Sequence, residues 1–134
     1  MPKIAIRYVT RQRKPELKRA VAELASRLAA EHLKKDLSVT AVLVEPADPE
    51  SWFVAGSHPT DDGLSAFWLD IKITAGTNTK AETAAFIRHA FEGMGSLLGP
   101  LHPESYVLVD AVDGDAYGYG GRTQNARWAQ ANPD

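Results

Sequence analysis

The sequence of 134 residues contains no cysteine, so it has neither a disulfide framework nor a thiolate for catalysis or metal binding. Its charges nearly cancel, to a formal net charge of -2 at pH 7, which leaves no general basic field for nucleic acid. No apolar run approaches the roughly 20 residues that cross a bilayer. The amino terminus also lacks the charged and apolar regions of a signal peptide. These absences predict a cytoplasmic protein that binds neither nucleic acid nor membranes.

The sequence does contain an internal repeat at an offset of 65 residues. Residues 41–52 (AVLVEPADPESW) align with residues 106–117 (YVLVDAVDGDAY), so that Trp52 takes the place of Tyr117. The same offset relates three further pairs without a gap: Ile4 and Leu69, Ile6 and Ile71, and Arg7 and Lys72. One register that holds across several elements indicates a tandem duplication. We expect one domain, 1–134, made of repeats at about 2–57 and 67–122 with a short C-terminal tail.

Each repeat is predicted to be a strand, a helix and a strand, from the hydrophobic periodicity. The expected strands are 3–9, 38–45, 67–74 and 105–112, and the expected helices are 15–34 and 79–98. The second helix is expected to turn one apolar stripe inward: Ala84, Ile87, Ala90, Phe91, Met94 and Leu98. Because parallel crossovers are right-handed, two such units form a four-stranded sheet with both helices on one face, which is an α+β fold.

The other face of that sheet has no third layer to cover it, because the chain is too short to supply one. Self-association is therefore expected. The aromatic candidates for this contact, each of which would also fit in the core, are Trp52, Phe53, Trp68 and Trp128.

Pro2 opens the first strand directly behind Met1. A proline nitrogen inside a chain is an amide without a proton, whereas at a free terminus it is an amine with a reference pKa near 8. Removal of Met1 would therefore turn Pro2 into a potential acid–base group. A purely structural proline is the other interpretation, since proline suits the first residue of a strand.

These features together resemble the tautomerase superfamily: a Met-Pro start on a strand, two βαβ repeats, and the aromatic and glycine segment 117–122 (YGYGGR) after the last strand. Residues 66–77 are similar to the middle strand of 5-carboxymethyl-2-hydroxymuconate isomerase, and residues 49–52 to a short dimeric bacterial tautomerase. The resemblance implies the fused, long-chain branch, which includes cis-3-chloroacrylate dehalogenase. It also implies a trimer, no metal or organic cofactor, and a small anionic enol or unsaturated keto acid as the substrate.

In that family the amino-terminal proline moves the proton, so Pro2 is the expected catalytic residue. Nearby cations would lower the pKa of its amine by disfavouring the ammonium form. Lys3 is expected on the other side of the strand, which leaves other cations to supply this field. The expected substrate-binding residues are Arg11, Arg13, Arg7, Lys72, Trp52, Tyr117 and Arg122.

The sequence also departs from the family. The second strand of each repeat has lost the arginine of the short tautomerases, and Thr74 and Thr77 stand where the dehalogenase branch has two arginines. This disfavours a dehalogenase or hydratase of the cis-3-chloroacrylate type. Two further functions stay open: a lyase resembling malonate semialdehyde decarboxylase, with a cationic Pro2, and a non-catalytic trimeric binding protein. The four histidines show no metal-ligand spacing.

Overall fold

Two strand–helix–strand units share one sheet in the computed structural model, which describes residues 2–133. The main elements are β1 (Lys3–Val9), α1 (Leu17–Leu33), β2 (Ala41–Pro46), β3 (Ala66–Thr74), α2 (Lys80–Leu98) and β4 (Tyr106–Val112). All six predicted elements are therefore confirmed. The largest difference in their bounds is at β2, where residues Leu37–Val39 form a short 3-10 helix before the strand begins.

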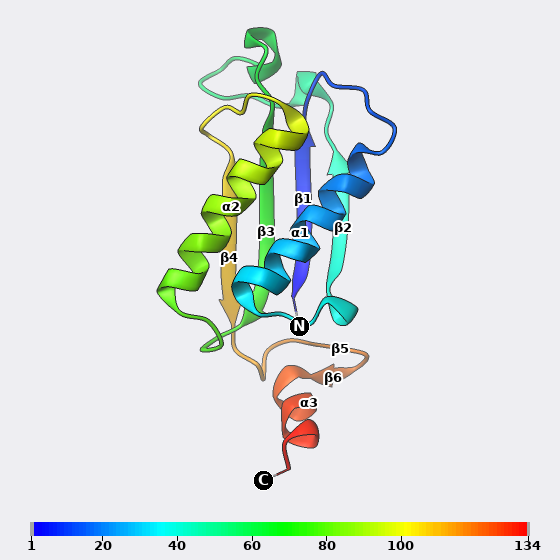
Figure 1. The fold of residues 1–134 in the computed structure, drawn as a ribbon, viewed down its shortest axis with the longest axis vertical. Helices are drawn as coiled ribbons and strands as arrows, with labels where there is room; N and C mark the ends of the chain where they lie inside the picture. Colours follow the sequence, from blue (N-terminus) through cyan, green and yellow to red (C-terminus); the bar gives the residue numbers. More distant parts are fainter. Residues whose placement is uncertain (1, 134) are drawn as a thin grey trace.

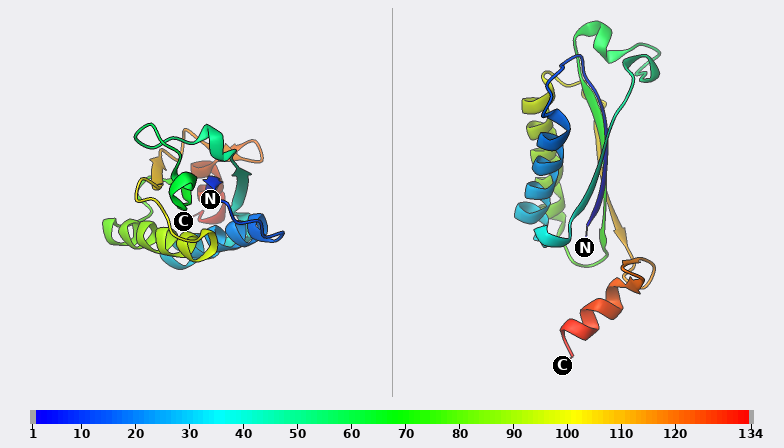
Figure 2. Two further views of the ribbon diagram at one scale, coloured as in Figure 1. Left: turned by 90° about the horizontal axis from the view of Figure 1, so that it is seen from above. Right: turned by 90° about the vertical axis from the view of Figure 1, so that its right-hand side faces the viewer.

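The strands run in the order β2-β1-β3-β4. Each repeat contributes a parallel pair, β1 with β2 and β3 with β4, and the antiparallel pairing of β1 with β3 joins the two repeats. Both long helices cover the same face of the sheet (Figures 1 and 2). The predicted α+β fold is thus confirmed.

The hydrophobic core lies between the sheet and the two helices. Alternate residues of β1, such as Ile4 and Ile6, point into it because successive side chains of a strand face opposite ways. The predicted stripe of α2 was partly wrong. Ala84 and Ile87 are exposed, and the core residue missed by the prediction is Phe86, which is fully buried. The helix is rotated because Phe86 has more apolar surface to bury than Ala84.

The other face of the sheet, which we call the open face, carries both apolar and charged side chains. Leu43, Trp68, Tyr106 and Leu108 are each about half exposed there or more. Of the four aromatic residues considered for contacts between copies, Trp52 is buried and therefore part of a core, together with Val9 and Ala66. The other three are exposed: Phe53, Trp68 and Trp128.

The two repeats also share specific interactions at the offset of 65 residues. Arg7 pairs with Glu45 at 3.6 Å on the open face, and the equivalent Lys72 pairs with Asp110 at 3.0 Å. Tight turns recur as well, since the antiparallel bridge between Val54 and Ser57 is matched by Tyr119 and Arg122 in the second repeat. The duplication thus extends beyond the strands to their side-chain contacts and to the hairpin after each unit.

The chain beyond β4 includes the turn expected at residues 117–122, and the short tail expected after it contains a helix. It forms a small hairpin, β5 (Gly118–Tyr119) with β6 (Arg122–Thr123), followed by the helix α3 (Gln124–Ala131). This unit extends past the end of the sheet where β1 begins (Figures 1 and 2). Within residues 2–133, no helix has the length and apolar character needed to cross a membrane.

The paired hairpin turns predict opposite effects of two substitutions. Both central residues of each turn have a positive φ, which is 51° at Ala55 and 61° at the equivalent Gly120. Because alanine is disfavoured in this conformation, Ala55→Gly should stabilise the protein by about 0.5 kcal/mol. Gly120→Ala should destabilise it by about 1 kcal/mol or more, since the new methyl would also meet the Arg127 side chain. Urea unfolding at one protein concentration measures both, and equal signs would contradict the prediction.

Candidate active site

Pro2 lies at one end of the sheet, where β1 and β2 begin and where β3 and β4 finish; we call this the Pro2 end. Pro2 is buried, and its carbonyl oxygen accepts a hydrogen bond from the backbone N–H of Ala41 at 3.3 Å. This bond ties the start of the central strand to β2. Met1, whose removal would free the Pro2 nitrogen, lies outside the described residues.

Two lysines flank Pro2 on the open face. Lys3 and Lys72 are directly opposite each other on the antiparallel strands β1 and β3, so their side chains leave the same face. Lys72 donates to Asp110 at 3.0 Å, which neutralises one of the two charges. Both lysines are therefore at the Pro2 end of the sheet.

Lys3 was thus wrongly ranked behind Arg7. Both residues are on the open face, since they are an even number of positions apart, but Arg7 is four residues further along β1 and is engaged with Glu45. Four residues of strand place it about 13 Å further from Pro2 than an adjacent residue. The strand period alone would have shown this.

A chain of hydrogen bonds links the end of α1 to the end of β3 and to Tyr117. The Lys35 ammonium donates to the Thr77 hydroxyl at 2.9 Å, and that hydroxyl donates to the Thr74 carbonyl oxygen at 2.6 Å. The Thr74 side chain is in turn hydrogen bonded to the Tyr117 hydroxyl at 2.6 Å. Tyr117, which follows β4, is therefore at the Pro2 end, as the resemblance implied.

Sequence reasoning missed Lys35 altogether. Its position follows from the end of α1, where Lys34 adopts a left-handed conformation (φ 58°) and turns the chain back toward the sheet. Burial lowers the pKa of Lys35 from its ordinary value, and the nearby Glu82 carboxylate opposes that shift. The only signal in the sequence was a pair of lysines after a helix, which is common at helix ends.

Arg11, Arg13 and Trp52 lie at the other end of the sheet. Arg11 follows β1 and is bonded to the Thr60 carbonyl oxygen at 2.7 Å, beside Asp61. The length of β1 separates it from Pro2 by about 25 Å. These three residues can approach a Pro2 only if it belongs to another copy of the chain.

Arg122 belongs to the hairpin after β4. Together with Tyr117 it lines a cavity of about 300 Å³ between the hairpin and the segment that precedes it. The structure therefore brings Pro2, Lys72, Tyr117 and Arg122 to one end of the molecule. Within residues 2–133, no group of three histidine, aspartate or glutamate side chains is arranged to hold a metal ion.

The comparison with solved structures identifies the fold. A wild-type fused 4-OT, solved as a symmetric trimer, has a TM-score of 0.80 at 17% identity, over 93% of this chain and 98% of that chain. The chain has the fused 4-OT fold. The fold that the resemblance implied, with two units fused in one chain, is thus confirmed.

Two other solved structures match the fold with similar TM-scores. A macrophage migration inhibitory factor-like protein from Entamoeba histolytica has a TM-score of 0.74 at 18% identity, over 91% of this chain and 97% of that chain. A protein inactivated by 2-oxo-3-pentynoate has a TM-score of 0.79 at 16% identity, over 92% and 98%. No protein-family model and no curated protein matches the sequence.

The environment of Lys35 predicts a measurable titration. Its pKa should lie below the ordinary lysine value, and Glu82→Gln should lower it further by removing the opposing charge. Because the folded pKa is the lower one, the unfolded chain binds more protons between the two values, so stability should rise as the pH rises through this window. NMR of the lysine side chains follows the titration. A rise in the Lys35 pKa on Glu82→Gln would contradict the assignment.

Proposed function

We propose that this protein is a tautomerase or isomerase that uses the amine of Pro2 as a general acid–base group. Its substrate is a small anionic enol or unsaturated keto acid. The observation that carries the proposal is Pro2 itself, which is buried at the start of the central strand of a fused 4-OT fold. The lysines at the same end of the sheet support it.

The reaction begins with a free amine, so Met1 has to be removed. The neutral amine takes a proton from the enol oxygen or a carbon of the substrate and returns it to another carbon, so no net proton is consumed. Burial and the nearby ammonium group of Lys3 both disfavour the charged amine and lower its pKa toward neutrality, whereas the charge of Lys72 is offset by Asp110. The Pro2 amine can then act as a base near neutral pH.

The same lysines take over the role of the arginines that the sequence has lost. Lys3 and Lys72 are directly opposite each other, and Asp110 pairs with Lys72 from the far side, on β4. A substrate carboxylate would relieve the remaining repulsion, and the developing enolate would be stabilised by the same charges. Lys35 adds a third ammonium on the helix side, and the hydroxyl of Tyr117 a neutral donor.

Self-association completes the proposal. Fused 4-OT structures of this fold include symmetric and asymmetric trimers. We propose a homotrimer, which would cover the exposed apolar residues of the open face. In such an assembly Arg11, Arg13 and Trp52 act on substrate only if they reach the Pro2 end of a neighbour, whereas Tyr117 and Arg122 act from the same chain.

Pro2→Ala tests the catalytic amine. Turnover of phenylenolpyruvate or 2-hydroxymuconate should fall by about 100-fold or more, because a positioned acid–base group contributes at least that much. Pro15→Ala, a change at an exposed proline at the other end of β1, is the matched control and should leave turnover unchanged. Mass spectrometry of the natural amino terminus accompanies the assay, and retained Met1 or unchanged turnover in Pro2→Ala would reject the proposal.

Titration of the amine separates the tautomerase from the lyase. A Pro2 pKa at or below about 8 fits a base, and a higher value fits a cation that polarises a carbonyl. Since a neighbour of the same fold is inactivated by 2-oxo-3-pentynoate, the same reagent can locate the nucleophile. The conjugated alkyne should add to the free amine, leaving a mass adduct on the peptide that begins with Pro2 and none when Met1 is retained.

Substitution of single cations decides which of them binds the substrate. Lys72→Ala should raise KM about tenfold with a smaller effect on kcat, as expected for the loss of one charged hydrogen bond. Lys14→Ala, an exposed lysine at the other end of the sheet, is the control. If Arg11→Ala has the larger effect on KM, the lysine assignment is wrong and a neighbouring copy supplies the guanidinium.

A further inference from the structure

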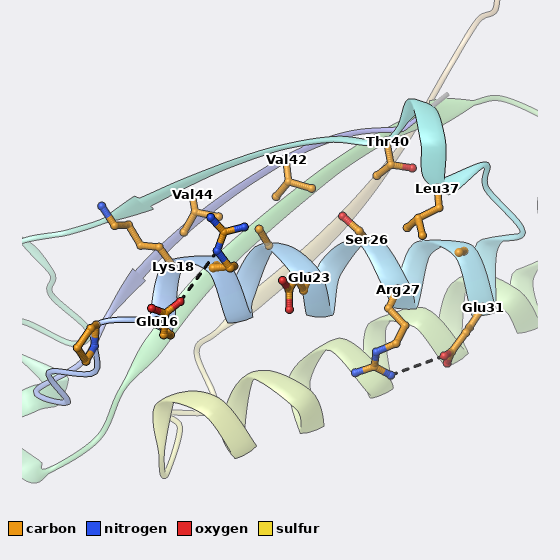
Figure 3. Close-up of a pocket in the computed structure, with 14 residues that line it drawn as sticks. Glu16, Lys18, Glu23, Ser26, Arg27, Glu31, Leu37, Thr40, Val42 and Val44 are labelled. Atoms are coloured by element: carbon orange, nitrogen blue, oxygen red, sulfur yellow. Dashed lines mark ion pairs between the residues drawn. The ribbon is translucent and has the colours of Figure 1, made fainter.

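A groove of about 1110 Å³ between α1 and β2 is poorly suited to an anionic substrate. Its lining carries three basic and three acidic side chains, so it offers no net positive charge. Two ion pairs within it are Arg19 with Glu16 at 4.0 Å and Arg27 with Glu31 at 3.6 Å (Figure 3). Pro2 does not line this groove. The groups that recognise substrate oxygens are therefore to be sought among the polar side chains at the Pro2 end of the sheet.

Thr74 and Tyr117 form a pair of hydroxyl side chains at that end, with their oxygens 2.6 Å apart. The strand register sets Lys72 opposite Lys3. Thr74, two residues further along the antiparallel strand β3, therefore lies just past the level of Pro2. Residues two apart on a strand share a face, so the Thr74 side chain is on the open face, as Lys72 is. The hydroxyl pair is thus beside the start of β1.

The first repeat has no such pair. At the offset of 65 residues, the counterparts of Thr74 and Tyr117 are Val9 and Trp52, which are buried together in a small apolar core. The same two places in the scaffold thus hold apolar groups at one end of the sheet and hydroxyl groups at the other. Folding of the repeat does not require hydroxyls at these places, so the pair at the Pro2 end points to a role in the site.

The hydroxyl of Tyr117 depends on Thr74 for its position. The backbone of Tyr117 is tied to α3, because the Gln124 N–H donates to the Tyr117 carbonyl oxygen at 3.0 Å. Within residues 2–133, the bond to Thr74 is the one side-chain hydrogen bond between residues 113–133 and the earlier chain. Removal of the Thr74 hydroxyl would therefore leave the Tyr117 hydroxyl without its anchor on the sheet.

The backbone of Thr74 is itself fixed from the helix side. The Thr77 hydroxyl donates to the Thr74 carbonyl oxygen at 2.6 Å and accepts from the Lys35 ammonium at 2.9 Å. The Asn78 side-chain amide donates to the Leu33 carbonyl oxygen at 2.8 Å, which holds the same turn against the end of α1. Thr74 is therefore a fixed point on which its hydroxyl partner is oriented.

The two hydroxyls have one proton more than their mutual hydrogen bond uses. Each hydroxyl can donate once, and within the described residues this bond is the only one that either the Thr74 or the Tyr117 side chain makes. When Thr74 donates, the proton of the phenol is left for a third group. Negative charge on a nearby ligand oxygen favours this arrangement, because hydrogen bonds in a chain polarise one another.

We propose that Thr74 is a positioning residue of the Pro2 site, which directs the Tyr117 hydroxyl toward the substrate oxygen that gains negative charge. While the Pro2 amine moves the proton, that charge is on the enolate oxygen, and the Tyr117 hydroxyl donates a hydrogen bond to it without transferring its own proton. Thr74 donates in turn to the tyrosine oxygen. This inference rests on the proposed function and adds to it a neutral donor whose direction a second residue sets.

Thr74→Val tests this role, because valine has the shape of threonine without the hydroxyl and already occupies the equivalent position 9. We expect kcat for phenylenolpyruvate to fall about tenfold with little change in KM, since the hydrogen bond strengthens as charge develops. Thr74→Ser keeps the hydroxyl and should retain most of the activity. Thr83→Val, at a half-buried threonine of α2, is the matched control and should leave turnover unchanged.

Tyr117→Phe separates positioning from a merely structural effect. If Thr74 acts through Tyr117, the two single variants should lose similar amounts of kcat, and the double variant should be no slower than either. If the two losses multiply in the double variant, the residues act independently and the positioning role is wrong. The comparison also stands if Thr74→Val folds poorly, because Tyr117→Phe with full kcat would by itself contradict the proposal.

Oxalate binding gives a readout that does not depend on turnover. Oxalate has the arrangement of oxygens found in the enolate of a 2-keto acid, whereas acetate has the carboxylate alone. By NMR titration, Thr74→Val should raise the Kd of oxalate about tenfold, as expected for the loss of one hydrogen bond to a charged group, and leave the Kd of acetate unchanged.

Three results of these experiments would overturn the positioning role: a wild type that does not bind oxalate, equal losses for oxalate and acetate in Thr74→Val, or full kcat in that variant. Turnover that depends on Pro2 but not on Thr74 defeats this inference alone. Selective loss of oxalate binding in Thr74→Val, with a wild type that has no enol turnover, defeats only the Pro2 proposal.

Discussion

The antiparallel pairing of β1 with β3 is the contact on which the other features depend. It joins two repeats, each of which on its own would form only a two-stranded sheet. Two strands alone are at best marginally stable. Its register sets Lys3 against Lys72 and places Pro2 beside the end of β3. A slip of one residue would turn every core side chain of β1 to the open face, so the hydrophobic core fixes the position of Pro2.

The same pairing places equivalent positions of the two repeats at opposite ends of the sheet, and the residues at these positions differ. At one end are Pro2, Thr74 and Tyr117, and at the other their counterparts Phe67, Val9 and Trp52. Phe67 is fully buried in the main core, and Trp52 packs with Val9 in a small second core at that end. A proline amine requires a chain terminus, so only one end of a fused chain could carry the proposed chemistry, and the other gains stability by burying aromatic surface.

Periodicity in the sequence predicted the six main elements because apolar spacing records which face each one buries. It was less reliable within α2, where the choice between Ile87 and Phe86 depends on the shape of the sheet opposite. Periodicity could not predict which side chains from distant parts of the sequence lie close together. Lys35 reaches the Pro2 end only through a left-handed turn at Lys34 and a contact with Thr77, and Arg11 was expected near a proline from which β1 separates it.

The sequence by itself determined the duplication, the class of fold and the single proline that a free terminus would make basic. These follow from local patterns, since strand and helix periods and a repeated register are properties of neighbouring residues. Only the tertiary structure decided which cations lie at the Pro2 end of the sheet, which aromatic residues are core, and that α3 extends past the sheet. Those are contacts between residues far apart in the chain, and their geometry depends on the packing of all the elements together.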